Sequence, residues 1–243
     1  LLSPQDQALF RQLSLFDGGF SLEAAEALGR GKQSGPTSVL DGIASLVAQS
    51  LVQAVAEVGD EPRYAMLETL REFGLEQLAK HDDVAQARRQ HASYFLAFGA
   101  SMATRLHGAA MSQHLTWLSA ELPNLRAAFD WTLTEGGDAD AVLGVLAALT
   151  PFWRFRGYLS EGRRWLAQAM TTASSTVITR IDGLVAAAEL AVFQGDHGSA
   201  RTLGEEGLEL ARRHGYPLGE ARALFLLAIS AELGGNLDGA ITL

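Results

Sequence analysis

Phe155-Arg156-Gly157-Tyr158 is the stretch that decides how the last third of this 243-residue chain folds. The same local pattern returns as Phe193-Gln194-Gly195-Asp196, 38 residues later, and as Leu233-Gly234-Gly235-Asn236, another 40 residues on. A fixed period of this size is typical of stacked helical hairpins, in which each hairpin buries its apolar side against its neighbours. The sequence therefore predicts helical repeats over residues 138–243.

The second helices of the repeats share the same pattern of small and apolar residues. Two sets of residues match: Gly162, Trp165, Leu166, Ala169 and Met170, and Ala200, Leu203, Gly204, Gly207 and Leu208. The pattern resembles the tetratricopeptide repeat (TPR), with longer loops than a period of about 34 residues allows. Small side chains are expected where the two helices of each unit cross, at Gly162, Ala200 and Ala240 and at Thr150, Ala188 and Ala228. Helix caps are predicted at Ser160, Gly198 and Asp238.

The first eighty residues predict a different module. Segments with apolar residues at helical spacing are separated by short runs of turn residues. Ser38 and Asp41 form a capping-box pattern at the start of the third of these segments. A short β-branched run, a turn and a second short run predict a β-hairpin. The predicted helices are Gln5–Phe16, Leu22–Leu28, Ser38–Gln49 and Thr69–Lys80, and the predicted strands are Ser50–Ala56 and Arg63–Leu67.

This order of elements predicts a winged-helix-like domain over residues 1–80, followed by a helical linker bundle over residues 81–137. Within the linker, His91 lies on an apolar stripe and is expected to be packed, while Pro123 is expected to break or kink its helix. The predicted fold class is therefore mostly α: a winged-helix-like module with a small β-hairpin, then a TPR-like α-superhelix. The last repeat is incomplete at Leu243, so an excised fragment is expected.

Composition excludes several classes of site. The chain carries a net charge of −9 and no cysteine, which excludes disulfides and thiolate zinc sites. The longest largely apolar run, Ala141–Trp153, is too short to span a bilayer, and no signal peptide is visible. We expect a cytoplasmic protein with no membrane contact. No metal site and no catalytic motif is predicted, so the chain itself is not expected to be an enzyme.

The charge of the first domain argues against direct binding of nucleic acid. Residues 1–80 hold six Lys/Arg and eleven Asp/Glu, or 6 − 11 = −5, and the predicted recognition helix Ser38–Gln49 has no Lys or Arg. Reading DNA requires cations for the phosphates and commonly Arg or Lys for the base edges. The alternative that stays open is a winged-helix DNA-binding protein with a helical oligomerisation arm.

Two motifs resemble a known family. Leu46-Val47, Ser50-Leu51-Val52 and the run from Tyr64 to Phe73 resemble the winged-helix end of the NB-ARC type of STAND ATPase. Its bacterial members include multidomain transcriptional regulators of LuxR-type or antibiotic-regulator kind. The resemblance implies a regulatory and sensor fragment of a longer protein that binds ATP or ADP upstream. No cofactor is implied in this fragment, and oligomerisation is possible in the full-length protein.

The resemblance also implies candidate site residues. The family has a Met-His-Asp motif where Met66, Leu67 and Glu68 stand, and its histidine contacts the nucleotide phosphates. Leu67 has no side-chain donor, so a histidine sensor is absent; the alternative for Met66 and Leu67 is core packing.

By analogy with TPR proteins, one face of the first helices lines a groove for a protein, peptide or small inducer. The alternative is that its aromatic residues fill the core between repeats and its charges are merely solvated. The residues predicted on this face are Arg154, Phe155, Asp182, Glu189, Phe193, Arg222, Phe225 and Glu232.

Overall fold

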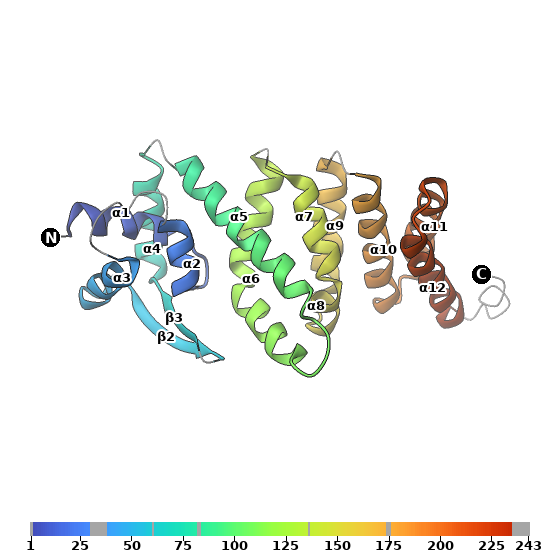
Figure 1. Ribbon diagram of the computed structural model, residues 1–243, viewed down its shortest axis with the longest axis horizontal. Coiled ribbons are helices and arrows are strands. Elements are labelled where there is room, and N and C mark those ends of the chain that lie inside the picture. The colour runs from blue at the N-terminus through green and yellow to red at the C-terminus, as the bar shows by residue number, and fades with distance from the viewer. Residues whose placement is uncertain are drawn as a thin grey trace. The chain divides into compact units, whose positions relative to one another are not determined.

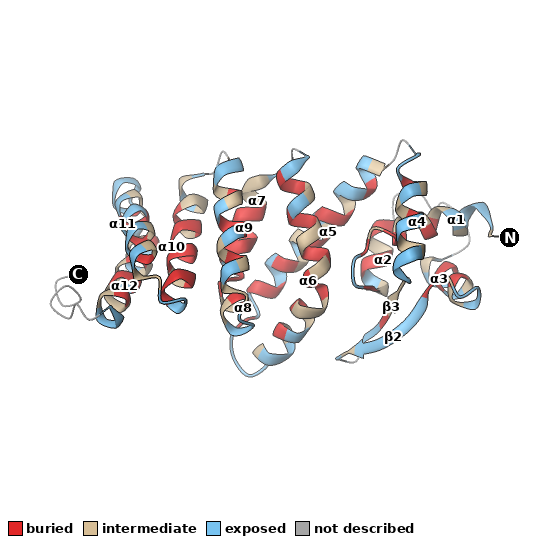
Figure 2. Ribbon diagram, turned by 180° about the vertical axis from the view of Figure 1, so that it is seen from behind, coloured by how far each residue is buried: buried red, intermediate tan, exposed pale blue. Residues whose placement is uncertain are grey.

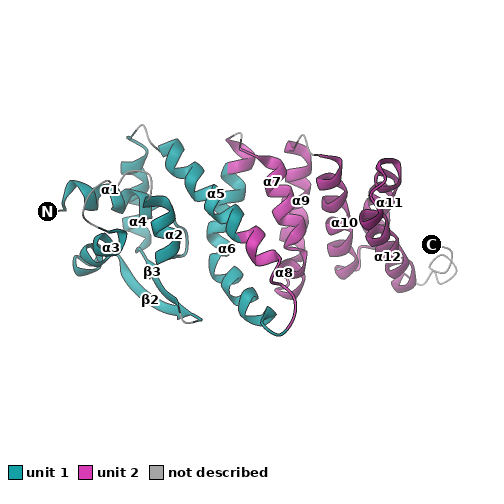
Figure 3. Ribbon diagram, viewed as in Figure 1, with its two compact units in different colours: residues 1–98, 109–131 teal, residues 99–108, 132–243 magenta. Residues whose placement is uncertain are grey.

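The computed structural model describes residues 2–29, 38–59, 61–81, 84–135, 137–173 and 176–234 (Figure 1). The chain divides into two compact units, Leu1–Phe98 with Ala109–Trp131, and Gly99–Gly108 with Thr132–Leu243 (Figure 3). This division cuts across the predicted ranges 1–80, 81–137 and 138–243, because most of the predicted linker belongs with the first unit. The predicted mostly α fold is confirmed.

The first unit is a winged helix followed by parts of two long helices. Its small sheet lies among four short helices. The elements are α1 (Pro4–Leu13), β1 (Phe20–Ser21), α2 (Leu22–Gly29), α3 (Val39–Ala48), β2 (Gln53–Val58), β3 (Glu61–Ala65), α4 (Glu68–Leu78), and most of α5 (Val84–Ala103) and α6 (Met111–Thr134).

Short-range signals determine the helix starts in this unit. Ser38 Oγ accepts a hydrogen bond from the Asp41 amide at 3.1 Å, and the Asp41 carboxylate accepts from the Ser38 amide at 3.2 Å, so the predicted capping box is confirmed. Ser21 Oγ accepts a hydrogen bond from the Ala24 amide at 3.2 Å and caps α2. These bonds satisfy amide groups that have no partner within their helix.

The sheet is antiparallel with the strand order β1-β3-β2. The predicted hairpin is confirmed, but β1, which pairs Phe20 with Tyr64, was not predicted. The first hairpin strand begins three residues later than predicted, because the Leu46 carbonyl accepts from both Leu51 and Val52 and the Val52 side chain is buried in the core.

Of the two outcomes expected at Pro123, a break or a kink, the break is excluded, because α6 continues through Pro123 to Thr134. The pyrrolidine ring packs against the turn before β1: a methyl group added at Gly18 would lie 3.0 Å from Pro123 Cγ. Proline costs a helix about 3 kcal/mol, and tertiary contacts on both sides of it offset that cost. Leu118, Leu122 and Leu125 on the same helix are buried.

The apolar spacing of Leu70, Phe73 and Leu78 in α4 predicts that Phe73 faces the core, and this is wrong. Phe73 is 52% exposed, because the buried side of this helix is narrow. Gly74 makes the close approach instead, and a methyl group there would lie 2.6 Å from Ser14 Cβ.

The second unit consists of stacked helical hairpins. Helix α10 packs against every other helix of the stack, and Figure 2 shows buried residues along it. Besides the ends of α5 and α6, the elements are α7 (Ala139–Ala148), α8 (Thr150–Phe155), α9 (Leu159–Thr172), α10 (Val177–Phe193), α11 (His197–His214) and α12 (Pro217–Leu233). None of the helices in the described ranges is both long and apolar enough to cross a membrane.

The sequence period corresponds to a repeated backbone motif. Gly157 and Gly195 both adopt the left-handed region, with φ of 75° and 74°, and each turns the chain between the helices of a hairpin. The amide after each glycine returns to the preceding helix, Tyr158 to the Trp153 carbonyl at 2.8 Å and Asp196 to the Ala191 carbonyl at 3.0 Å. The third copy continues beyond Gly234, outside the described residues.

The predicted caps of the second helices are wrong by two residues. Tyr158 and Asp196 stand at the N-cap positions, while Ser160 and Gly198 lie inside the first turn. Asp196 accepts a hydrogen bond from the Ser199 amide at 3.1 Å, whereas Tyr158 makes no side-chain cap. The predicted cap Asp238 lies outside the described residues, as do Ala240 and Leu243.

Replacement of Gly162 by alanine is expected to destabilise the fold by about 1–2 kcal/mol. The added methyl group would lie 2.8 Å from Cδ1 of Leu190 and 2.8 Å from Cγ of Trp153, where α9 crosses its neighbours. The matched control is Gly144→Ala in α7, which meets no atom within 4 Å and should stabilise by about 0.5–1 kcal/mol through helix propensity. Urea denaturation of both variants measures the two changes. Equal effects would contradict close packing at Gly162.

Candidate functional site

The helix that would enter a DNA groove presents no cation. Over residues 38–65, which include α3 and the wing formed by β2 and β3, the single basic residue is Arg63, against four acidic residues. Leu40 and Ala44 are exposed on α3 and Val55 is exposed on β2. These exposed side chains are apolar. Contacts with DNA phosphates require Arg or Lys instead.

Arg63 is not available to a ligand either. Its guanidinium is buried and donates to the buried carboxylate of Glu121, from α6. Near the tip of the wing, the indole of Trp117 packs on Gly59, where an added methyl group would lie 2.9 Å from Nε1. The wing is thus held against α6 at two points.

Asn124 completes this buried polar cluster. Its side chain is fully buried, accepts from the Asp17 amide at 2.8 Å, and donates to the Gly19 carbonyl at 2.9 Å and to Glu121 Oε2 at 2.8 Å. His91 Nε2 lies 3.5 Å from Asn124 Oδ1. Burial lowers the pKa of His91 to about 4, against a smaller opposing effect of that contact. The expectation that His91 is packed is confirmed.

Met66, Leu67 and Glu68, the predicted counterparts of a nucleotide-sensor motif, lie where β3 leads into α4. Met66 is half-buried, and Leu67 occupies the N-cap position of α4 with no side-chain cap. Leu67 is 52% exposed, so core packing is not its role. Glu68 accepts two hydrogen bonds from Arg71, at 2.6 and 3.0 Å, and this interaction lowers the pKa of the Glu68 carboxyl group.

Four of the predicted groove residues form one cluster between α8 and α10. Arg154 donates to Glu189 Oε1 at 3.2 Å, and its guanidinium lies 4.5 Å from the ring centroid of Phe155 and 4.8 Å from that of Phe193. Both rings are more than half exposed, so they do not fill the core between repeats. A cation held between two accessible aromatic rings forms a rigid contact surface.

A second cluster joins α10 to α12. Arg222 donates to Asp182 Oδ1 at 3.0 Å, and the Tyr216 hydroxyl lies 3.5 Å from the same oxygen. Burial raises the pKa of Asp182, while Arg222 and Tyr216 act in the opposite direction. Since Asp182 and Glu189 are seven residues apart on α10, the two clusters share one face of that helix. Phe225 and Glu232, the remaining predicted residues, are exposed on α12.

Two residues of these clusters carry no local sequence signal. Tyr216 precedes a helix without capping it, and Glu121 is one of many carboxylates on the helices. Asn124 did carry a signal, because it lies between the apolar residues Leu122 and Leu125, and buried amides require partners. The partners themselves come from distant segments and could not be named from the sequence.

Residues 2–79 match the winged helix-turn-helix domain family, in agreement with the first unit's elements. Three curated relatives, from Mycobacterium bovis and two strains of Mycobacterium tuberculosis, are named as candidate HTH-type transcriptional regulators. Each is 38% identical over 168 residues, which cover 68% of this chain and 18% of the relative. The chain therefore contains a winged helix-turn-helix domain and is similar to transcriptional regulators, while spanning about a fifth of their length.

Among solved structures, a STAND protein with a tetratricopeptide repeat sensor from Pyrococcus horikoshii aligns with 99% of this chain and 43% of its own. The sequence identity is 15% and the TM-score is 0.38. At that score no conclusion about this chain follows from the likeness.

We expect Arg63→Met alone to destabilise the first unit by about 3 kcal/mol, because Glu121 would remain buried without its cation. The double variant Arg63→Met/Glu121→Leu should cost less than the sum of the two single variants, since no buried charge is left unpaired. Denaturant titrations of the wild type, both single variants and the double variant measure this coupling. Additive effects would show that the ion pair does not hold the wing to α6.

Proposed function

We propose that this chain is the regulatory part of a longer transcriptional regulator, in which the helical repeats bind a protein, peptide or small inducer. The observation that carries the proposal is the face shared by α8, α10 and α12. It presents exposed aromatic rings beside two ion pairs, Arg154–Glu189 and Arg222–Asp182, that fix their side chains in place. Exposed aromatic residues beside ordered arginines are the composition of binding hot spots.

Under this proposal the winged helix is a packing and relay module. Arg63, the single basic residue of residues 38–65, is paired with Glu121, and the wing lies against α6. In the longer protein, the winged helix would pass the ATP- or ADP-bound state of an upstream ATPase domain to the repeats. The exposed Leu67 at the start of α4 supports a contact with such a domain rather than a role in the core.

Ligand binding would then act by shifting populations of the longer protein. A ligand changes a conformational equilibrium only by its difference in affinity for the two states. A face built from several stacked hairpins suits this requirement, because small changes in the angle between hairpins alter the spacing of Phe155 in α8 and Phe193 in α10, which belong to successive hairpins.

A DNA-binding winged helix is the second candidate, and the match of residues 2–79 to helix-turn-helix domains favours it. Fluorescence anisotropy with a labelled mixed-sequence DNA duplex separates the two. We expect no saturable binding at low salt, since α3 lacks cations and Arg63 is buried. Tight binding that weakens steeply with added salt would support the DNA-binding candidate instead.

The repeat face is tested by selecting peptides from a random display library on the wild-type chain. Binders should lose at least tenfold in affinity with Phe193→Ala, because truncating an aromatic hot spot costs about 1.4 kcal/mol or more. Phe73→Ala on α4 is the matched control, since Phe193 and Phe73 are both 52% exposed. Calorimetric titration gives the affinities. Binders that are indifferent to Phe155→Ala and Phe193→Ala would exclude this face as the site.

A further inference from the structure

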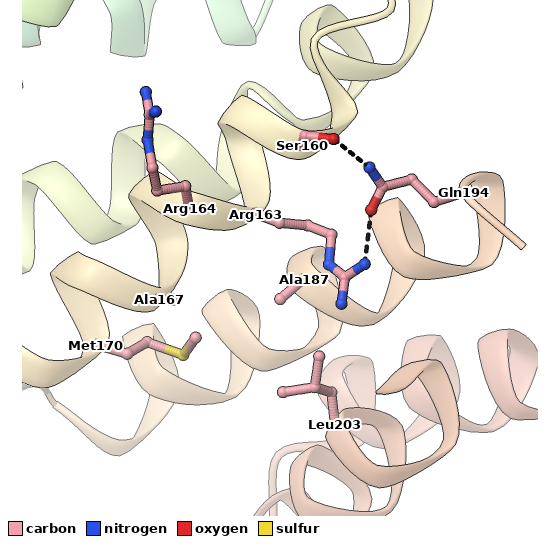
Figure 4. A pocket seen from close by; sticks show the side chains of 8 residues that line it. All are labelled: Ser160, Arg163, Arg164, Ala167, Met170, Ala187, Gln194 and Leu203. Atoms are coloured by element: carbon pink, nitrogen blue, oxygen red, sulfur yellow. Dashed lines mark hydrogen bonds between the residues drawn. The ribbon is translucent and has the colours of Figure 1, made fainter. Parts of the chain in front are cut away.

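A pocket in the repeats is lined by none of the residues of the aromatic face. It is an open pocket of about 400 Å³ between α9, α10 and α11, within the usual range for small-molecule sites (Figure 4). Its lining residues are Ser160, Arg163, Arg164, Ala167 and Met170 of α9, Ala187 of α10, the α10 C-cap residue Gln194, and Leu203 of α11. Successive helix residues are about 100° apart, so Ala187 lies on the opposite side of α10 from Glu189 of the aromatic face, and the two sites are separate.

One end of the pocket is polar and already ordered. Gln194 accepts from Arg163 at 2.6 Å and donates to Ser160 Oγ at 2.7 Å, as the dashed lines in Figure 4 show. Arg163 also donates to Asp196 Oδ2 at 2.8 Å. These bonds use two of the five N–H donors of the guanidinium and hold the others in a fixed orientation. Because the fold already orders the Arg163 side chain, a ligand that binds its free N–H groups loses little side-chain entropy.

Arg163 supplies the positive charge at this end. Asp196 pairs with one of its N–H groups, and the hydrogen bonds from Ser199 and Arg163 lower the pKa of the Asp196 carboxyl group to about 2, so it is ionised at neutral pH. The Arg164 side chain points away from Arg163 and Gln194 in Figure 4, with its guanidinium 5.7 Å from the ring centroid of Trp165, and takes no part in this end. The remaining N–H donors of Arg163 favour a group that accepts hydrogen bonds and carries a negative charge, such as a carboxylate.

The other end is apolar. Met170 and Leu203 face each other across the buried methyl group of Ala187 in Figure 4. The small side chains of Ala167 and Ala187 create the hollow, and a methionine thioether adapts to ligands of varied shape. The pocket therefore has the two-ended character of a site for an amphipathic molecule.

We propose that this pocket binds a small carboxylic acid with an apolar alkyl or aryl body. The carboxylate lies at the end formed by Arg163, Gln194 and Ser160, and the apolar body lies between Met170 and Leu203. The proposal does not depend on the function assigned to the aromatic face, because the two sites share none of their residues.

Isothermal titration calorimetry of the whole chain with octanoate tests the proposal. Octanoate should bind saturably with one site per chain. Octylamine has the same apolar body but a cationic head, and acetate has the carboxylate without the body, so both should bind at least tenfold more weakly. Equal binding of octanoate and octylamine, or no binding of octanoate at millimolar concentration, overturns the proposal.

Two variants locate the binding. Ala167→Trp places a large side chain in the pocket from an exposed position, and should weaken octanoate at least tenfold while leaving the circular dichroism spectrum unchanged. Ala97→Trp is the matched control, an exposed alanine of α5 outside the pocket, and should leave octanoate affinity unchanged. Equal octanoate affinity in the wild type and Ala167→Trp overturns the assignment to this pocket. Peptide binding to the aromatic face should persist in Ala167→Trp, so failure at one site is distinguishable from failure at the other.

Discussion

The hydrogen bonds of Asn124 are the constraint on which the first unit depends. This one buried amide satisfies the Asp17 amide and the Gly19 carbonyl before β1, and it also orients Glu121. Glu121 in turn holds Arg63 of β3. Because a half-satisfied buried network costs more than none, the turn, the wing and α6 must order together. The continuation of α6 through Pro123 is one consequence, since the proline lies between Glu121 and Asn124 and packs on the same turn.

That constraint also governs what the winged helix is able to contact. Moving Arg63 to a DNA phosphate would leave Glu121 buried and unpaired, at a cost of about 3–5 kcal/mol. A charge-assisted hydrogen bond contributes only about 1.5–3 kcal/mol, so one such contact does not offset the loss. The helix-turn-helix fold is thus retained here, while the single basic residue of residues 38–65 is held by a carboxylate of α6. Fold and DNA recognition are separable, because recognition depends on the side chains presented rather than on the elements.

The sequence was sufficient to predict the local structure wherever the deciding interaction joins residues that are close in the sequence. Ser38 and Asp41 are three residues apart, and Gly157 and Gly195 each need only a left-handed turn, so the capping box and the repeat were predicted correctly. The sequence was insufficient to predict strand β1 or the continuation of α6 through Pro123. The bond between Asp17 and Asn124 spans 107 residues and that between Arg63 and Glu121 spans 58. Contacts of that separation leave no periodic pattern in the sequence, and local geometry alone does not show that distant packing keeps α6 continuous through Pro123.

In the repeats, the helical period of the sequence predicted which residues share the aromatic face. It did not predict which charged residues on that face pair with each other. Arginines tie neighbouring helices together through Arg154–Glu189, Arg163–Asp196, Arg180–Glu206, Arg212–Glu220 and Arg222–Asp182. Partly exposed pairs contribute only about 0–1 kcal/mol each, so they do not explain the stability of the stack, which rests on close crossings such as that at Gly162. Their effect is on the surface: the paired charges are ordered and largely neutralised, while Phe155 and Phe193 stay accessible. An aromatic surface with fixed, balanced charges selects a partner by shape and apolar contact more than by net charge.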